Sequence, residues 1–214
     1  MRVLALVLAV AWLGAFPAPL DSQVVLERYG IALAGLLAPK AVVFVYSVSQ
    51  AGPENIEQRH RIYRSGIDVR DETLAVNGLA LKRKRVRIGH RPDPYGVLAL
   101  APRPDAYEML FVKSIADGSH LDYVYQTQPL VHGGGFVVDR VTIDGESFLP
   151  RVVEFHTSGA LASGSGSVKF GSAGGYWVPL VASASAAIGG SVARERIVFS
   201  DYEFPSSLPR STFL

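Results

Sequence analysis

From residue 41 onward, apolar and polar residues alternate with a period of two over short segments, as side chains do on the two faces of a β-strand. Turn residues separate these segments at Asn77-Gly78, Asp117-Gly118, Asp144-Gly145 and Gly189-Gly190, and such dipeptides favour tight hairpins because they accept positive φ. The pattern predicts about eleven strands, over residues 41–50, 56–65, 69–76, 79–88, 106–115, 121–127, 136–143 and 147–157, in a strand ending at Phe170, and in the two strands of a hairpin within 176–204.

The last two hairpins resemble each other in sequence. Phe148, Pro150 and Phe170 recur 29 positions later as Trp177, Pro179 and Phe199. Short connections of this kind join antiparallel neighbours, so the chain is expected to form a meandering antiparallel sheet.

A helix is predicted before the strands, over residues 21–37. Asp21 or Ser22 can cap its start, apolar residues such as Val25, Tyr29 and Leu33 recur at helical spacing, and Pro39 is expected to stop it. Residues 91–105 contain four prolines, which cannot donate hydrogen bonds to a sheet, so this segment is expected to be a crossover or flap.

These elements predict a mainly β fold with some α structure. A sheet of about eleven strands must curl or close. We therefore expect a strongly curved antiparallel sheet, an incomplete β-barrel, with the N-terminal helix packed on its concave side.

The N-terminus is a different kind of segment. Met1-Arg2 precedes an almost unbroken apolar run over residues 3–16, which is short for a membrane span and typical of a secretory signal peptide. An uncleaved anchor or a buried helix is the alternative. We predict a signal peptide over 1–18, one half-barrel domain over 19–204, a loop-like tail over 205–214, and a soluble exported or periplasmic protein.

Composition excludes several classes of site. The chain has no cysteine, hence neither disulfides nor thiolate metal ligands, and its formal charge of +2 does not demand nucleic acid. Basic residues are concentrated at Lys82-Arg83-Lys84-Arg85 and Arg87, within a predicted strand. An anion or nucleic-acid patch is one interpretation, but no aromatic residues interleave with the run, and basic side chains also protect an exposed sheet edge. The edge interpretation is favoured.

A search for catalytic patterns gives little. The five histidines show no metal-binding spacing, so no metal or cofactor is predicted. His132 and the three glycines after it resemble an esterase oxyanion segment, yet Ser163-Gly164-Ser165-Gly166-Ser167 lacks the nucleophile-elbow spacing. We expect a protein that is not an enzyme.

The apolar alternation instead indicates a cavity. Strands that are apolar on both faces need a cover on each face or a ligand on one, and a row of small alanines leaves room beside the sheet. The helix and the 91–105 segment could fill this space. The candidate cavity-wall residues are Phe44, Tyr46, Tyr107, Met109, Phe111, Tyr123, Tyr125, Leu180, Ala182, Ala184 and Ala186.

This arrangement resembles the LolA/LolB-like superfamily of periplasmic outer-membrane lipoprotein carriers and related lipid-binding proteins. The closing pattern W-x-P…F-x-x-Y-x-F carries the likeness, here Trp177-Val178-Pro179 and residues 199–204. Tyr63-Arg64-Ser65-Gly66, followed by Arg70-Asp71-Glu72-Thr73, is similar to a branch separate from the carriers proper. The resemblance implies an incomplete barrel whose apolar cavity holds acyl chains.

The function expected from the resemblance is binding or transport of a lipid, a lipoprotein acyl chain or another apolar ligand. The expected partners are a lipid or an acylated protein, with transient membrane or receptor contact and no nucleic acid, and the protein is expected to be a monomer. The alternative is an envelope sensor or scaffold that uses the same fold to bind a protein partner without lipid. A hydrolase built on His132 and a serine is a third hypothesis.

Overall fold

The computed structural model describes residues 18–52, 55–91, 96–118, 120–131, 133, 135–159, 163–188 and 191–214. In this part of the chain one α-helix, α1 (Ser22–Ala34), precedes eleven strands. The strands are β1 (Ala41–Ala51), β2 (Ile56–Ser65), β3 (Asp68–Val76), β4 (Leu79–His90), β5 (Tyr107–Asp117), β6 (His120–Pro129), β7 (Phe136–Ile143), β8 (Pro150–Ser158), β9 (Ser163–Ala173), β10 (Tyr176–Ile188) and β11 (Ser191–Glu203). Two short 3-10 helices, η1 (Gly96–Ala99) and η2 (Arg210–Phe213), complete the elements.

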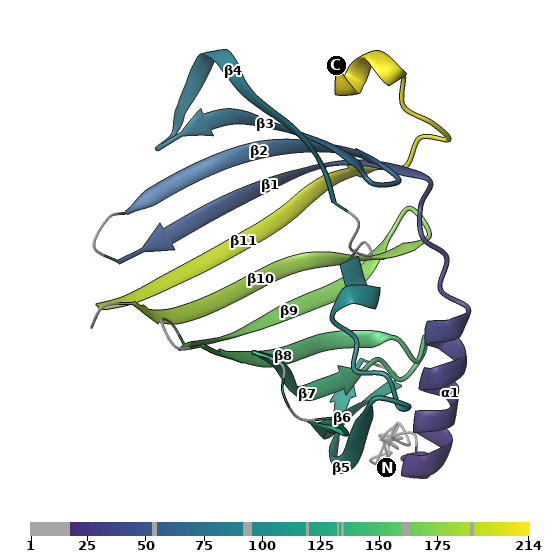
Figure 1. Cartoon of the computed structure of the whole chain (residues 1–214). Coiled ribbons are helices and arrows are strands. Elements are labelled where there is room, and N and C mark those ends of the chain that lie inside the picture. The colour runs from purple at the N-terminus through teal and green to yellow at the C-terminus, as the bar shows by residue number, and fades with distance from the viewer. Residues whose placement is uncertain are drawn as a thin grey trace, which may run out of the picture.

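All the strands belong to one antiparallel sheet, in the order β4-β3-β2-β1-β11-β10-β9-β8-β7-β6-β5 (Figure 1). Neighbours in the sheet are also neighbours along the chain, except that the first and last strands, β1 and β11, pair in its middle. The consecutive strands β4 and β5 form the two opposite edges. The sheet therefore curves without closing, and the predicted fold class is confirmed.

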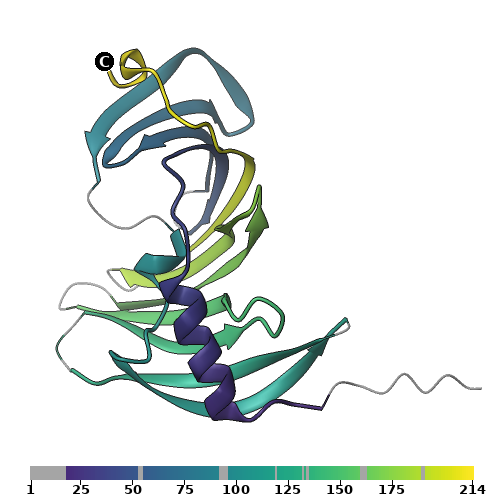
Figure 2. The same ribbon diagram turned by 90° about the vertical axis from the view of Figure 1, so that its right-hand side faces the viewer.

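Helix α1 lies across one end of the concave side of the sheet (Figure 2). Asp21 caps it, since its Oδ1 atom accepts a hydrogen bond of 2.8 Å from the Gln23 amide. Val25, Tyr29 and Leu33, four residues apart, are buried along one face. They form the main core together with sheet residues Tyr123, Tyr125, Val138, Val141, Ile143, Val153, Val168 and Phe170.

The connection from β4 to β5 crosses the concave side of the sheet (Figure 1), as a crossover between its two edges must. Its 3-10 helix η1 contacts β10. The buried Tyr29 hydroxyl of α1 donates a hydrogen bond of 2.9 Å to the carbonyl oxygen of Pro102. Helix and crossover thus cover the concave face together, but only in the half of the sheet formed by β5–β10.

The turn between β7 and β8 packs tightly against β6. A Cβ atom on Gly145 would overlap the carbonyl oxygen of Leu121, so this turn needs glycine for close approach. Asp144 fixes the same turn because its Oδ1 atom accepts hydrogen bonds of 2.7 Å from both the amide and the hydroxyl of Ser147.

Several boundaries differ from the prediction. Helix α1 ends at Ala34 rather than near Pro39, since Gly35 is its C-cap and donates to the Ile31 carbonyl oxygen. The strand predicted from residue 147 begins at Pro150, because Phe148 has a φ of 56° that ends extended backbone.

The C-terminal residues also differ from the loop-like tail expected. They include η2, which contacts β3, and Arg70 of β3 donates a hydrogen bond of 3.0 Å to the Thr212 carbonyl oxygen. The predicted signal peptide, apart from its last residue, and the Gly189-Gly190 turn lie outside the described residues. No helix in the described part of the chain has the length and apolar character needed to cross a bilayer.

Candidate ligand-binding groove

A groove of about 350 Å³ lies on β1, β2, β3 and β11, in the half of the sheet that α1 does not reach. Most of its lining is apolar or aromatic, and the rest is charged. The apolar and aromatic residues are Phe44, Tyr46, Val48, Ile62, Val69, Ile197 and Phe199, and the charged residues are Arg64, Asp71, Arg91 and Glu195.

Strand register shows that this groove is on the concave face. Ala182 packs against the core under α1 and pairs with Ile197, which in turn pairs with Val48. Directly paired residues share a face, as do alternate residues of one strand. Tyr46 and Phe199, which pair with each other, therefore face the same side as the helix, and both stay half-buried.

Aromatic rings form the floor of the groove. The ring of Phe44 lies 6.0 Å from that of Phe199 and 5.4 Å from that of Tyr202, and Tyr46 lies 6.2 Å from Phe199. The Tyr202 hydroxyl is fixed by a hydrogen bond of 2.7 Å to the carbonyl oxygen of Pro179 on β10. Ring separations of this size are typical of packed aromatic clusters. The cluster gives the groove a floor that is in place before any ligand binds.

Asp71 joins two side chains at the polar end of the groove. Its carboxylate lies 2.7 Å from Nδ1 of His60 and accepts a long hydrogen bond of 3.5 Å from the Tyr46 hydroxyl. Burial, and then the charge and hydrogen bond of Asp71, raise the pKa of Tyr46 to about 12. Tyr46 is therefore a neutral hydroxyl at physiological pH.

Charged side chains line the rest of the rim. Arg64 donates hydrogen bonds to the carbonyl oxygens of Gly66 and Arg91, at 3.1 and 3.3 Å, which ties β2 to the start of the crossover. Arg91 lines the groove beside Arg64, and Glu195 lines it from β11. The groove thus has an apolar floor and a charged rim.

The structure distributes the predicted cavity-wall residues over several places. Phe44 and Tyr46 line the groove. Tyr123 and Tyr125 are buried under α1, where Tyr107, Met109 and Ala182 pack against the same core. Phe111 is 39% exposed on the edge strand β5. As ligand contacts, all of these residues remain predictions.

The alanine strand does not line this groove. Ala184 is exposed and Ala186 is half-buried. Both lie near the C-terminal end of β10. Leu180 is the extra residue of a bulge between Pro179 and Val181, and it lies over Gly171. Because Phe170 faces the helix, the next residue, Gly171, faces away from it, so Leu180 does not share the face of Ala182.

The prediction missed several residues that do line the groove. Val48 shares the face of Tyr46 by simple alternation, and the register of the last hairpin would have added Ile197 and Phe199. Asp71 carries no such signal in the sequence, because only the pairing of β2 with β3 brings it beside its partner His60.

A second cluster combines carboxylates with basic groups on β5, β6, β8 and the β7–β8 turn. Nε2 of His120 lies 3.5–3.7 Å from carboxylate oxygens of Asp117, Asp122 and Asp144. Asp117, His120 and Asp122 could hold a metal ion, and they are the group in the described residues with suitable spacing. Arg151 already contacts Asp117 and Asp122, the latter at 2.8 Å, so an ion pair network accounts for these carboxylates.

A larger hollow of about 690 Å³ lies on β1, β7, β8, β9, β10 and β11. Its side chains include Ser49, Ser167, Ser183 and Arg196, which pair across the strands on the convex face. Hydroxyl and charged groups dominate this lining, so it suits an apolar ligand less well than the groove does.

The hydrolase hypothesis gains no support from the described residues. Ser163, Ser165 and Ser167 lie within strand β9, not on a strand-to-helix turn. His132 lies outside the described residues. The groove itself is lined by no serine, threonine or cysteine among the residues that the structure describes.

No protein-family model and no curated protein matches the sequence. Solved structures do match. A DUF1329 family protein from Desulfovibrio piger shares 7% identity, with a TM-score of 0.50 over 90% of this chain and 96% of the other. LolA superfamily protein NE2245 from Nitrosomonas europaea shares 13% identity over 92% and 98% of the two chains, with a TM-score of 0.45.

A putative outer membrane lipoprotein-sorting protein domain from Vibrio parahaemolyticus also shares 13% identity, over 90% of this chain and 97% of the other, with a TM-score of 0.48. At these identities the likeness is one of fold. The match to the Desulfovibrio piger protein, at a TM-score of 0.50, agrees with the curved antiparallel sheet that the sequence predicts.

Proposed function

We propose that this protein is a non-enzymatic binding or carrier protein that holds a lipid, a lipoprotein acyl chain or another apolar ligand in the groove on β1, β2, β3 and β11. The observation that supports this most is the half-buried aromatic floor formed by Tyr46 and Phe199. The corresponding face of the other half-sheet is covered by α1 and the crossover. The floor of the groove has no such cover among the described residues.

The energetics favour an apolar ligand. Each buried methylene group contributes about 0.8 kcal/mol, so an acyl chain can bind well without a specific polar contact. Ligand sites of this kind are mostly apolar with a few polar groups that fix orientation, and their volumes begin at about 300 Å³. The groove, at about 350 Å³, is of the right size and composition. Arg64 and Arg91 at its rim would hold an acidic head group if the ligand has one.

We also propose that the protein acts outside the cytoplasm. This proposal rests on the predicted signal peptide and on the name of the Vibrio parahaemolyticus match, which is a putative lipoprotein-sorting domain. A scaffold that binds protein alone is the competing function.

The test is titration of a fluorescent long-chain fatty acid into the purified protein. Ile197→Asn places a polar amide in the groove, and we expect it to weaken binding about tenfold, from the loss of roughly 1.5 kcal/mol of apolar contact. The matched control is Val198→Asn on the adjacent position of β11, which is 38% exposed and pairs with Val181 on the other face. It should leave binding unchanged.

Native mass spectrometry of the protein after gentle purification provides the second measurement. A copurified apolar molecule in the wild type, reduced in Ile197→Asn, would support a carrier. If the protein takes up no acyl probe and carries no apolar molecule, while a pull-down recovers a stoichiometric protein partner, the scaffold function replaces the one proposed.

A further inference from the structure

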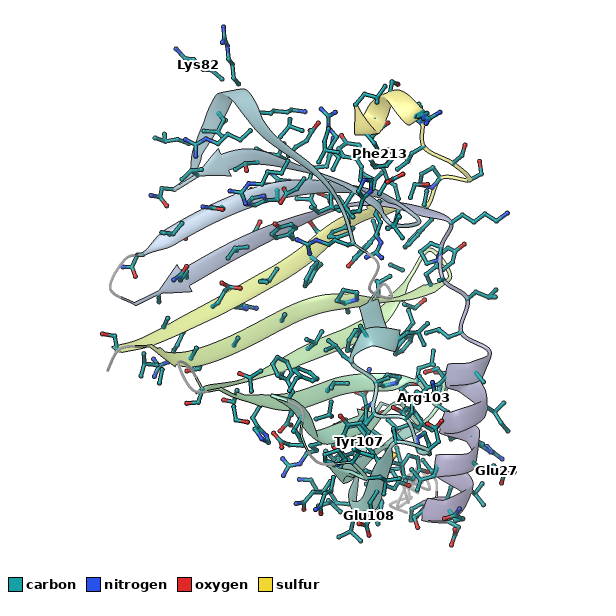
Figure 3. All side chains as sticks on the ribbon, in the orientation of Figure 1. Glu27, Lys82, Arg103, Tyr107, Glu108 and Phe213 are labelled. Carbon is teal, nitrogen blue, oxygen red and sulfur yellow. The ribbon has the colours of Figure 1, made fainter. Side chains whose placement is uncertain are left out.

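The edge strand β4 is basic along most of its length. Five of its residues are cationic, Lys82, Arg83, Lys84, Arg85 and Arg87, and it contains neither aspartate nor glutamate. Lys84 is paired with Glu72 at 2.8 Å. For the other four, no ion pair with a described residue is found. Figure 3 shows Lys82 projecting from β4, away from the body of the protein.

The same strand also exposes aliphatic side chains. Leu79, Val86 and Ile88 are 74%, 41% and 45% exposed, and every residue of β4 except Leu81 is exposed. Aliphatic residues interleaved with basic ones fit the interface of a phospholipid bilayer, where head-group phosphates meet the ends of the acyl chains. A surface for single-stranded nucleic acid would instead carry stacking aromatic residues, which β4 lacks.

The basic strand borders the groove. In the β3–β4 register Arg87 lies opposite Asp71, which lines the groove. Arg91 immediately follows β4 and also lines the groove. By register, Arg85 and Arg87 face the concave side, whereas Val86 and Ile88 face the convex side. A surface that contacts β4 therefore lies directly beside the groove opening.

We propose that β4 is a docking surface for an anionic phospholipid membrane, with head-group phosphates bound by Lys82, Arg83, Arg85 and Arg87. Docking through this strand brings the groove beside the bilayer from which an apolar ligand would enter or into which it would leave. The transfer of an apolar ligand between groove and bilayer rests on the proposed function. The membrane contact itself rests only on the charge and exposure of β4.

The experiment is cosedimentation of the full chain with vesicles of phosphatidylcholine alone and of phosphatidylcholine mixed with phosphatidylglycerol. The test variant is Arg83→Gln/Arg85→Gln. The matched control, Arg194→Gln/Arg196→Gln, removes the same charge from two exposed residues of β11. We expect the wild type and the control to bind only the anionic vesicles, and the test variant to bind them about 30-fold more weakly, at about 1 kcal/mol per basic residue.

Three results would overturn the proposal. The first is no binding, or equal binding to both vesicle types. The second is an equal loss in both double variants, which would mean that net charge alone matters. The third is binding to a short DNA duplex without binding to vesicles. Titration of the fluorescent fatty acid into the same variants separates the two proposals, because Arg83→Gln/Arg85→Gln should retain acyl binding in solution whether or not it binds vesicles.

Discussion

The imidazole of His60 is stacked on the ring of Tyr46, with ring centroids 4.7 Å apart and planes within 4° of each other. The two residues face each other across the β1–β2 pair, and both contact Asp71 on β3. Three neighbouring strands are thus joined by one small polar cluster at the end of an apolar groove. The cluster rigidifies the wall against which a ligand would lie.

This cluster predicts a pH dependence at the alkaline end. The pKa of Tyr46 is raised from 10.0 to about 12 in the folded protein. The folded protein favours the neutral hydroxyl of Tyr46. The stabilisation that this gives is complete below pH 10 and is lost as the pH rises through about 12. We expect Tyr46→Phe to reduce the fall in the free energy of unfolding over this interval, measured by urea denaturation. An unchanged pH profile would contradict the assignment.

The contact between α1 and the crossover predicts a stability effect. The Tyr29 hydroxyl is buried and donates to the Pro102 carbonyl oxygen, so Tyr29→Phe leaves that acceptor without its partner. We expect a loss of about 1–3 kcal/mol in the free energy of unfolding. Tyr63→Phe is the control, since Tyr63 is only half-buried on β2. Equal effects of the two substitutions would show that the crossover is not held by this bond.

Close packing at the β7–β8 turn predicts a severe glycine substitution. In Gly145→Ala the new methyl group would overlap the backbone of Leu121, which cannot move without disturbing β6. We expect a loss of more than about 2 kcal/mol, measured as a lower midpoint of thermal or urea unfolding. Gly89→Ala on β4 should be close to neutral, because nothing lies within 4 Å of its added methyl. A tolerated Gly145→Ala would mean that the turn is looser than described.

The same turn predicts a pH dependence at the acid end. Burial alone would raise the pKa of Asp144, but hydrogen bonds from Ser147 and Glu146, together with the charge of Arg151, lower it below 3.8. A lowered pKa stabilises the folded state above the ordinary value, and the contribution is lost as the pH falls through the folded value.

Asp144→Asn therefore should destabilise the protein at neutral pH by roughly 1–3 kcal/mol, the usual contribution of hydrogen bonds to a charged group. It should have less effect in acid, where the wild type has lost the same charge. Urea denaturation at neutral pH and at a pH below the folded pKa of Asp144 makes the comparison. A destabilisation that is the same at both pH values would assign the role of Asp144 to geometry alone.

The strands could be predicted because alternation and turn dipeptides are local signals. The predicted half-barrel followed from them, since so many short-linked strands must curl. Which part of the concave face stays open is a different matter. Tyr46 and Tyr125 show the same alternating pattern, yet α1 buries Tyr125 and leaves Tyr46 in the groove. The position of the helix, not the pattern within either strand, decides between the two.

Leu180 shows a second limit of pattern reading. Leu180 is two residues from Ala182, and the sequence around it alternates regularly. In a strand without a bulge the two side chains would lie on the same face. One extra residue between Pro179 and Val181 changes this. The extra residue shifts the pairing of β10 with β9 but leaves the alternation of residue types unchanged, so the amino-acid pattern does not reveal it.

The pairing of β1 with β11 has a consequence for how the chain folds. It joins Val43 to Glu203, and among the described strands no other pair connects the β1–β4 half of the sheet to the β5–β11 half. Each half is built from local hairpins, which form quickly, whereas contacts between distant residues are slow because they close a long loop. Synthesis must therefore reach the last strand before the sheet can become one piece.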